Sequence, residues 1–228
     1  PTRVVVTGIG AVTPLGNDRE STWSALVAGK SGVATITLFD PTPFAVRIFG
    51  EVKGFEPARY VEPKEARRLD RSTLFAVAAA KEAIEDSGLK VDQSNRDEIG
   101  IIVGTAIGGC KILLDHNKLL EERGPARASP NFIQYLVPDC ASGQIAISTG
   151  IRGPNHTVVS ACASGGHAIG EAMEMIRRGD VHTALVGGTD ACLLPVVLAG
   201  FIQMRVLATN NDQPEKAARP FDAKHEGS

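Results

Sequence analysis

The chain of 228 residues has few aromatic residues, no long apolar run and little net charge. Aromatic residues make up 5% of the sequence, which argues against a surface that stacks nucleic-acid bases. The 24 basic and 26 acidic side chains give a formal net charge of −2, so the charge balance favours neither a nucleic acid nor a membrane as a partner. No apolar run reaches the ~18 residues of a membrane-spanning helix. We therefore expect a soluble globular protein with no nucleic acid and no membrane as partner.

Cysteine is also scarce, and the four residues Cys110, Cys140, Cys162 and Cys192 form no CxxC pair. Their spacing matches no zinc template, so we predict no metal site. The N-terminal residues show no targeting pattern, and we expect a reducing cytoplasm in which most of these thiols are small core residues.

Glycine, in contrast, is abundant, and many of the 24 glycines follow short β-branched runs. Buried strands are predicted over residues 3–8, 99–103, 157–160 and 183–186. Helices are predicted from a capping box at Asn17 and Glu20 to Ala28, from Pro63 to Ser87, and over residues 110–122, 130–137, 139–149 and 162–178. Strands that alternate with helices indicate a layered α/β fold.

The first glycine-rich corner, Gly8-Ile-Gly10, is similar to the start of a dinucleotide-binding fingerprint. Thr13 stands where the third glycine would be, and Pro14-Leu-Gly16 delays the helix by several residues. A pyrophosphate would then have no helix N-terminus directly behind the turn, so we favour a tight strand-to-loop corner without a nucleotide.

A second corner places Cys162 where a predicted strand runs directly into a helix. The free N–H groups and the dipole of a helix N-terminus favour a thiolate, and they can hydrogen-bond an oxygen that gains charge during attack on a thioester. The alternative is a small buried cysteine without chemistry. His167 is five residues further on and faces another side of the helix, so we interpret it as packed or interfacial and not as a catalytic base.

A third corner, Gly187-Gly-Thr-Asp190, ends in a carboxylate. Asp190 could orient a neighbouring group, but an Asp after two glycines more often caps the turn that follows it. We favour the capping role.

Several segments then resemble one family in the same order along the chain, and the segment around the cysteine is the most specific of them. They are 4–16, Arg68-Leu-Asp70, 104–109, Arg152-Gly-Pro154, Ser160-Ala-Cys-Ala-Ser-Gly165, 187–190, Gly200-Phe201 and Arg219-Pro-Phe-Asp222. The chain resembles the N-terminal half of an elongating β-ketoacyl-acyl carrier protein synthase of type II fatty acid synthesis. The resemblance implies a thiolase-like fold with layered α-β-α-β-α architecture, of which residues 1–228 are the first half and a C-terminal half is absent.

The resemblance also implies the reaction. An acyl group passes from the phosphopantetheine arm of acyl carrier protein to Cys162, and malonyl-carrier protein then loses carbon dioxide and attacks the acyl thioester. The product is a 3-oxoacyl chain two carbons longer, and no cofactor is needed beyond the carrier's arm. Cysteine at position 162, where chain-length-factor subunits carry glutamine, argues against such a subunit.

Other residues take expected roles from the same resemblance. Ile107, Phe132 and Phe201 match positions that line or gate the acyl tunnel, with Phe132 contributed from the partner subunit of a homodimer. Lys64, Arg67 and Arg68 match the basic face that docks the acidic carrier protein, although such a cluster is often only a solvated surface. The resemblance implies a bacterial cytoplasm, or the stroma or matrix of an organelle, as the location.

The family's decarboxylating residues, two histidines and a lysine, lie in the second half, and the chain's own five histidines match none of them. We therefore expect the 228 residues alone to be inactive in condensation. Three alternatives stay open: a polyketide-type ketosynthase, a coenzyme A thiolase, and a non-catalytic half or scaffold that keeps the fold.

Overall fold

The structure, a computed structural model, describes residues 2–227 and divides into two compact units. The first unit comprises the residues up to Gly10 together with Glu56–Cys192. The second comprises Ala11–Phe55 and the residues from Leu193 on. Each unit is described by itself.

The first unit is built on a parallel sheet of three strands in the order β4-β3-β5. They are β3 (Ile99–Gly104), β4 (Asn155–Val158) and β5 (Thr183–Gly188). Every residue of the central strand β3 is buried, as expected for a parallel strand covered on both faces. In register, Gly104 at the end of β3 pairs with Val158 on one side and with Gly188 on the other.

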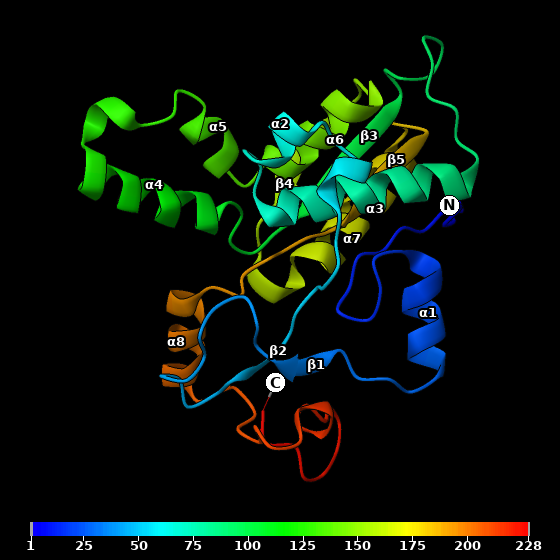
Figure 1. Cartoon of the computed structure of the whole chain (residues 1–228). Coiled ribbons are helices and arrows are strands. Elements are labelled where there is room, and N and C mark those ends of the chain that lie inside the picture. The colour runs from blue at the N-terminus through cyan, green and yellow to red at the C-terminus, as the bar shows by residue number, and fades with distance from the viewer. Residues whose placement is uncertain (1, 228) are drawn as a thin grey trace. The chain divides into compact units, whose positions relative to one another are not determined.

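Helices cover both faces of this sheet (Figure 1). On one face, Ile101 and Val103 of β3 pack with α3 (Arg71–Ser87) and α6 (Cys140–Thr149). On the other face, Ile102 packs with α7 (Ser164–Arg178). Successive residues of a strand point to opposite faces, which is why a continuous apolar run serves both helix layers. The predicted α/β class is confirmed.

A helical arm extends from these layers on one side of the unit (Figure 1). It consists of α4 (Cys110–Arg123), the short 3-10 turn η2 (Pro125–Arg127) and α5 (Phe132–Leu136). No residue of α4 is buried, and even the apolar side chains of Leu113, Leu114 and Leu120 are exposed. The helix ends predicted at Gly124 and at Pro138 are confirmed.

The predicted single helix over 63–87 is wrong, because two helices occupy this range. After the 3-10 turn η1 (Pro57–Arg59) come α2 (Pro63–Ala66) and then α3, which starts at Arg71. The carboxylate of Asp70 accepts the Ser72 N–H at 2.9 Å and caps α3, so a new N-terminus forms there. Gly88 ends α3 in the left-handed conformation, as predicted.

The predicted strand over residues 3–8 is also wrong. This segment forms no strand, and Val5 and Val6 are 57% and 79% exposed. The sheet of the described residues holds only β4, β3 and β5, and the β-branched run pairs with neither of its edge strands. Gly8 and Gly10 instead lie against α3, where a Cβ would overlap the carbonyl oxygens of Ala83 and Ala79.

The second unit contains an antiparallel pair, β1 (Val33–Thr35) and β2 (Ile48–Gly50), with α1 (Arg19–Val27), α8 (Pro195–Met204) and the 3-10 turn η4 (Pro214–Lys216). Its core includes Val46, Ile48 and Ala208. The predicted capping box is wrong: Asp18 caps α1 by accepting the Ser21 N–H at 2.7 Å, while Asn17 donates to Lys53 O. Within residues 2–227, no helix combines the length and hydropathy of a membrane span.

Candidate active site

Cys162 lies on a short turn between the end of β4 and the start of α7. Its backbone belongs to the 3-10 turn η3 (Ala161–Ala163), and the α-helix begins two residues after the cysteine, not at Cys162 as predicted. The thiol is exposed, in contrast to buried Cys140 and half-buried Cys110 and Cys192. The strand-turn-helix corner predicted from the sequence therefore exists, and it presents Cys162 at the surface of the unit.

Ser164, the first residue of α7, closes this turn with a hydroxyl that is 2% exposed. Its Oγ accepts the Ser160 N–H at 2.8 Å and lies 2.6 Å from Ala161 O and 3.1 Å from Thr105 O, to which it can donate. The hydroxyl thus connects the residues before Cys162 with the end of β3. Sequence reasoning missed Ser164, because its partners are visible only once β3 and β4 lie side by side.

Ala161, next to Cys162, adopts a left-handed backbone with φ of +52°. This conformation is unfavourable for a residue with a Cβ and is found where surrounding contacts hold it in place. Here the Ser164 hydroxyl bonds to Ala161 O, and Ala163 N donates to Ser160 O. The backbone turns at Ala161, and the next residue, Cys162, is exposed to solvent.

Three glycines allow the backbones around the turn to approach closely. A Cβ on Gly104 would overlap the backbone of Ser164, and a Cβ on Gly188 would come within 2.9 Å of the Gly165 Cα. The ends of β3 and β5 can therefore touch the first turn of α7. Close packing of the backbones therefore explains some of the small residues at this corner.

The other three cysteines are poorer nucleophiles than an ordinary thiol. Burial raises the pKa of Cys110, Cys140 and Cys192, and it is the largest cause in each case. The carboxylate of Asp70 raises the pKa of Cys110 further, and that of Asp190 raises the pKa of Cys192. A raised pKa leaves less thiolate at neutral pH in these three thiols. Exposure singles out Cys162 among the four.

His167 lies exposed on the first turns of α7, with Nδ1 2.7 Å from Ser160 Oγ. It is therefore not packed within this chain, while an interfacial place for it stays a prediction. This hydrogen bond joins α7 to Ser160, two residues before Cys162. It is exposed to solvent, whereas the bonds of Ser164 are partly or fully buried. Helical spacing could not have shown this pair, because Ser160 precedes the helix.

Ile107 follows β3 in the segment 105–108, and its side chain is 39% exposed. Thr105 O bonds to Ser164 Oγ, so this segment is joined directly to the turn of Cys162. The predicted capping role of Asp190 is wrong, because its carboxylate accepts no hydrogen bond from the described turn that follows it. Its carboxylate instead accepts hydrogen bonds from Thr105, Ala106 and Ile107, contacts that are compatible with the orienting alternative.

The two predicted tunnel phenylalanines lie on different elements. Phe132 begins α5, where its ring stacks on that of His116 of α4 at a centroid distance of 4.5 Å. Phe201 is half-buried on α8, in the second unit. Their tunnel roles stay predictions.

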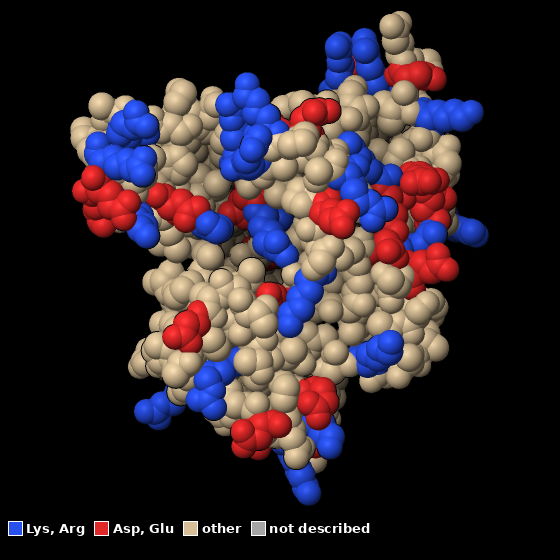
Figure 2. All heavy atoms as spheres, viewed as in Figure 1, with Lys and Arg blue, Asp and Glu red and all other residues tan. Residues whose placement is uncertain are grey.

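The predicted docking residues Lys64, Arg67 and Arg68 are all exposed on and just after α2. Figure 2 shows basic side chains gathered over α2. The Tyr135 hydroxyl donates to Glu65 Oε1 of α2 at 3.0 Å, and Arg68 lies near it. Burial and Glu65 raise the pKa of Tyr135, and Arg68 opposes this rise. The basic cluster is thus linked to α5 of the helical arm.

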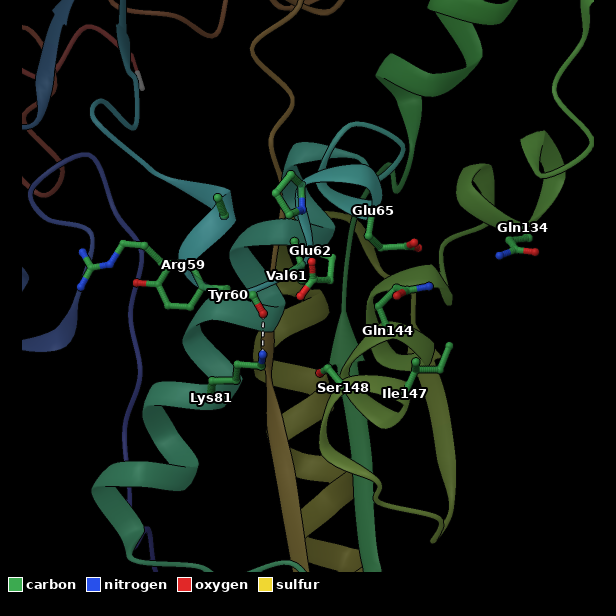
Figure 3. Close-up of a pocket in the computed structure, with 12 residues that line it drawn as sticks. Arg59, Tyr60, Val61, Glu62, Glu65, Lys81, Gln134, Gln144, Ile147 and Ser148 are labelled. Atoms are coloured by element: carbon green, nitrogen blue, oxygen red, sulfur yellow. Dashed lines mark hydrogen bonds between the residues drawn. The ribbon is translucent and has the colours of Figure 1, made fainter.

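A surface pocket of about 580 Å³ lies beside the same cluster (Figure 3). Lys81 of α3 donates to Tyr60 O at one side, and Gln144, Ile147 and Ser148 of α6 form another. Neither Cys162 nor Ile107 lines it. The pocket is therefore not the site of the nucleophile.

Comparison with known proteins shows the family of the chain. Residues 2–228 match the family described as "Beta-ketoacyl synthase, N-terminal domain". The chain belongs to the β-ketoacyl synthase family. It is 44% identical over 225 residues to 3-oxoacyl-[acyl-carrier-protein] synthase 2 of Synechocystis, a match that covers 99% of this chain and 54% of that protein.

Solved β-ketoacyl synthase structures confirm the thiolase-like fold. A β-ketoacyl synthase from Burkholderia phymatum gives a TM-score of 0.84 at 31% identity, covering 98% of this chain and 55% of that one. The ishigamide ketosynthase/chain length factor gives 0.85 at 31% identity, covering 98% and 54%. The chain thus spans about half the length of the synthases that it matches.

Proposed function

We propose that the chain is the nucleophile-bearing half of a 3-oxoacyl-[acyl-carrier-protein] synthase of fatty acid biosynthesis. The observation that carries the proposal is the exposed Cys162 on a turn closed by a buried hydroxyl, in a chain that belongs to the β-ketoacyl synthase family. The 44% identity to a protein of that name supports the choice within the family.

In the proposed reaction, Cys162 Sγ attacks the carbonyl carbon of an acyl thioester on the arm of acyl carrier protein. A tetrahedral oxyanion forms, the carbon–sulfur bond to the arm breaks, and the arm leaves as its thiol with the proton that Cys162 has lost. The backbone N–H groups at the start of α7 are the proposed donors to the oxyanion. No cofactor is needed for this transfer.

Condensation follows on the acylated cysteine. Malonyl-carrier protein loses carbon dioxide, its carbanion equivalent attacks the acyl carbonyl, a carbon–carbon bond forms, and the Cys162 thiolate leaves. The family's histidines and lysine for these steps lie outside the 228 residues, so we propose that the chain alone does not condense. Exposed Val5, Val6 and Val186 support this, because such apolar side chains are expected to be covered in the complete protein.

Two partners belong to the proposal. The first is acyl carrier protein, which is acidic in this family and would dock on Lys64, Arg67 and Arg68 by charge complementarity. The second is another copy of the same chain. A homodimer would cover the exposed side of α4 and the edge strand β4, and it would bring Phe132 near the partner's tunnel. The proposed location is the bacterial cytoplasm or an organelle's stroma or matrix.

A polyketide-type ketosynthase is the second candidate, favoured by the 31% identity to the ishigamide ketosynthase/chain length factor over 98% of this chain. The two candidates share the chemistry at Cys162 and differ in acyl substrate. Saturated acyl chains serve as substrates for one, and polyketide intermediates for the other.

The test is condensation by the complete protein with hexadecanoyl or octanoyl carrier protein and malonyl-carrier protein, read by mass spectrometry of the carrier-bound product. The proposal expects a 3-oxoacyl product two carbons longer, which Cys162→Ala abolishes while Cys192→Ala does not. A protein that extends only polyketide intermediates supports the second candidate. A complete, folded protein that extends neither is not a synthase.

A further inference from the structure

Asp190 brings together three hydrogen-bond donors from the segment that carries Ile107. Its carboxylate accepts from Thr105 Oγ1 at 3.0 Å, from Ala106 N at 3.0 Å and from Ile107 N at 3.3 Å. These donors lie 83 to 85 residues earlier in the chain. Asp190 reaches them because it follows β5, which pairs in register with β3 up to Gly104 and Gly188.

Thr105 connects this carboxylate to the nucleophile's turn. The residue is 1% exposed, so its polar atoms have little access to water. Its hydroxyl donates to Asp190 and accepts the Gly108 N–H at 3.2 Å, which folds the segment back on itself. Its carbonyl lies 3.1 Å from Ser164 Oγ and shares the one hydroxyl proton of Ser164 with Ala161 O, which lies at 2.6 Å. One continuous set of hydrogen bonds therefore runs from Asp190 through Thr105 to the turn of Cys162.

The backbone of Ile107 has little freedom within this set. Its own N–H is bound to Asp190, and the next residue, Gly108, has φ of +67° and lies against Pro138. A Cβ on Gly108 would come within 3.1 Å of the Pro138 Cα. The position of the Ile107 side chain is thus fixed from both sides of its backbone, by a charge-assisted bond before it and by close packing after it.

We propose that Asp190 is a positioning residue that sets acyl chain-length preference by holding Ile107 in place. The inference rests on the proposed function, since it takes Ile107 as a wall of the acyl tunnel. Asp190 itself does not touch the reacting atoms. Release of its carboxylate would let the segment 105–108 move, so that the size of the side chain at position 107 would no longer decide which acyl chains fit.

A purely structural role for Asp190 would lower stability without changing how position 107 acts. The two roles separate in a double-mutant cycle, because coupled residues give non-additive effects and independent ones give additive effects. The cycle combines Asp190→Asn with Ile107→Phe in the complete protein. Asp180→Asn is the matched control, an exposed carboxylate that bonds to Arg178 near the opposite end of β5.

The readout is the ratio of Cys162 acylation rates with hexadecanoyl and octanoyl carrier protein. In the wild-type background, Ile107→Phe should lower this ratio by about tenfold or more, the size of effect that one extra side-chain group makes in an apolar pocket. In the Asp190→Asn background the same substitution should change it by less than about threefold, because the coupling is lost. The Asp180→Asn background should keep the full effect.

Amide exchange of Ala106 and Ile107 tests the hold on the segment without any substrate. Asp190→Asn should speed exchange at both amides by about tenfold or more, since a bond to a charged acceptor is lost, while Asp180→Asn should not. An unchanged exchange rate in Asp190→Asn overturns the inference. So does an Ile107→Phe effect that is as large in the Asp190→Asn background as in the wild type. Failure of the proposed function looks different: the wild-type protein then takes no acyl group, and the specificity role falls with it.

Discussion

The Ser164 hydroxyl accepts the backbone N–H of Ser160 at 2.8 Å, so the first residue of α7 closes the turn that carries Cys162. This side chain is nearly inaccessible to solvent and also bonds toward Ala161 and Thr105. We therefore expect the reactivity of Cys162 to depend on Ser164, although this side chain need not contact a substrate.

Ser164→Ala should slow acylation of Cys162 and lower the free energy of unfolding by about 1–3 kcal/mol, because a buried N–H and carbonyl lose their partner. Single-turnover acylation and denaturant unfolding measure the two effects. Ser148→Ala is the control, since the Ser148 hydroxyl bonds only within its own helix to Ile145 O in the described structure, and it should change stability by less than about 0.5 kcal/mol. Wild-type acylation in Ser164→Ala would contradict this role.

Alkylation with iodoacetamide should label Cys162 first at neutral pH. Cys110, Cys140 and Cys192 have pKa values raised by burial, so each holds less thiolate than an ordinary cysteine at the same pH. Their labelling should therefore increase as the pH rises toward and above their ordinary values. Peptide mapping after timed alkylation gives the order, and labelling of Cys140 before Cys162 would refute it.

Charge reversal at Arg67 should weaken binding of acyl carrier protein, and the effect should diminish as salt concentration increases. Arg67 is a better choice than Arg68, because Arg68 lies near Tyr135 of α5 and lowers the pKa of its hydroxyl. Lys90→Glu, on an exposed loop after α3, makes the same charge change elsewhere. Titration calorimetry at two salt concentrations measures both variants, and equal affinities for the two would remove the docking proposal.

Gly10→Ala should destabilise the protein by about 1–3 kcal/mol, the usual cost of overpacking, because the new Cβ would overlap the Ala79 carbonyl of α3. A lower thermal unfolding temperature together with an unchanged rate of Cys162 acylation would show that the substitution disturbs packing alone. A variant as stable as the wild type would mean that the first glycine-rich corner does not lie against α3.

The parts of the fold that depend on neighbouring residues were predictable from the sequence. Gly88 ends α3 because the left-handed conformation suits glycine, and Cys162 lies at a strand-to-helix corner because the apolar run before it gives way to small residues. The resemblance then supplied the reaction, which spacing alone could not.

Two errors were local, since the caps Asp18 and Asp70 were not recognised, and the others involve partners far away in the chain. Residues 3–8 looked like a buried strand, but a strand needs a partner, and this run pairs with neither edge strand of the described sheet. Asp190 looked like a local cap, yet its donors lie more than 80 residues away and become neighbours only when β5 pairs with β3. Ser164 was overlooked for the same reason. The corner that carries Cys162 was predictable from the sequence, and the long-range contacts around it were not.

The central claim is that Cys162 is the acyl-carrying nucleophile, and intact-mass spectrometry tests it most directly. The complete protein, incubated with hexadecanoyl carrier protein and no malonyl substrate, should gain one hexadecanoyl group, mapped to Cys162. Cys162→Ala should gain none, and Cys192→Ala should be labelled as fully as the wild type. An adduct that persists in Cys162→Ala, or that maps to another cysteine in the wild type, would contradict the account.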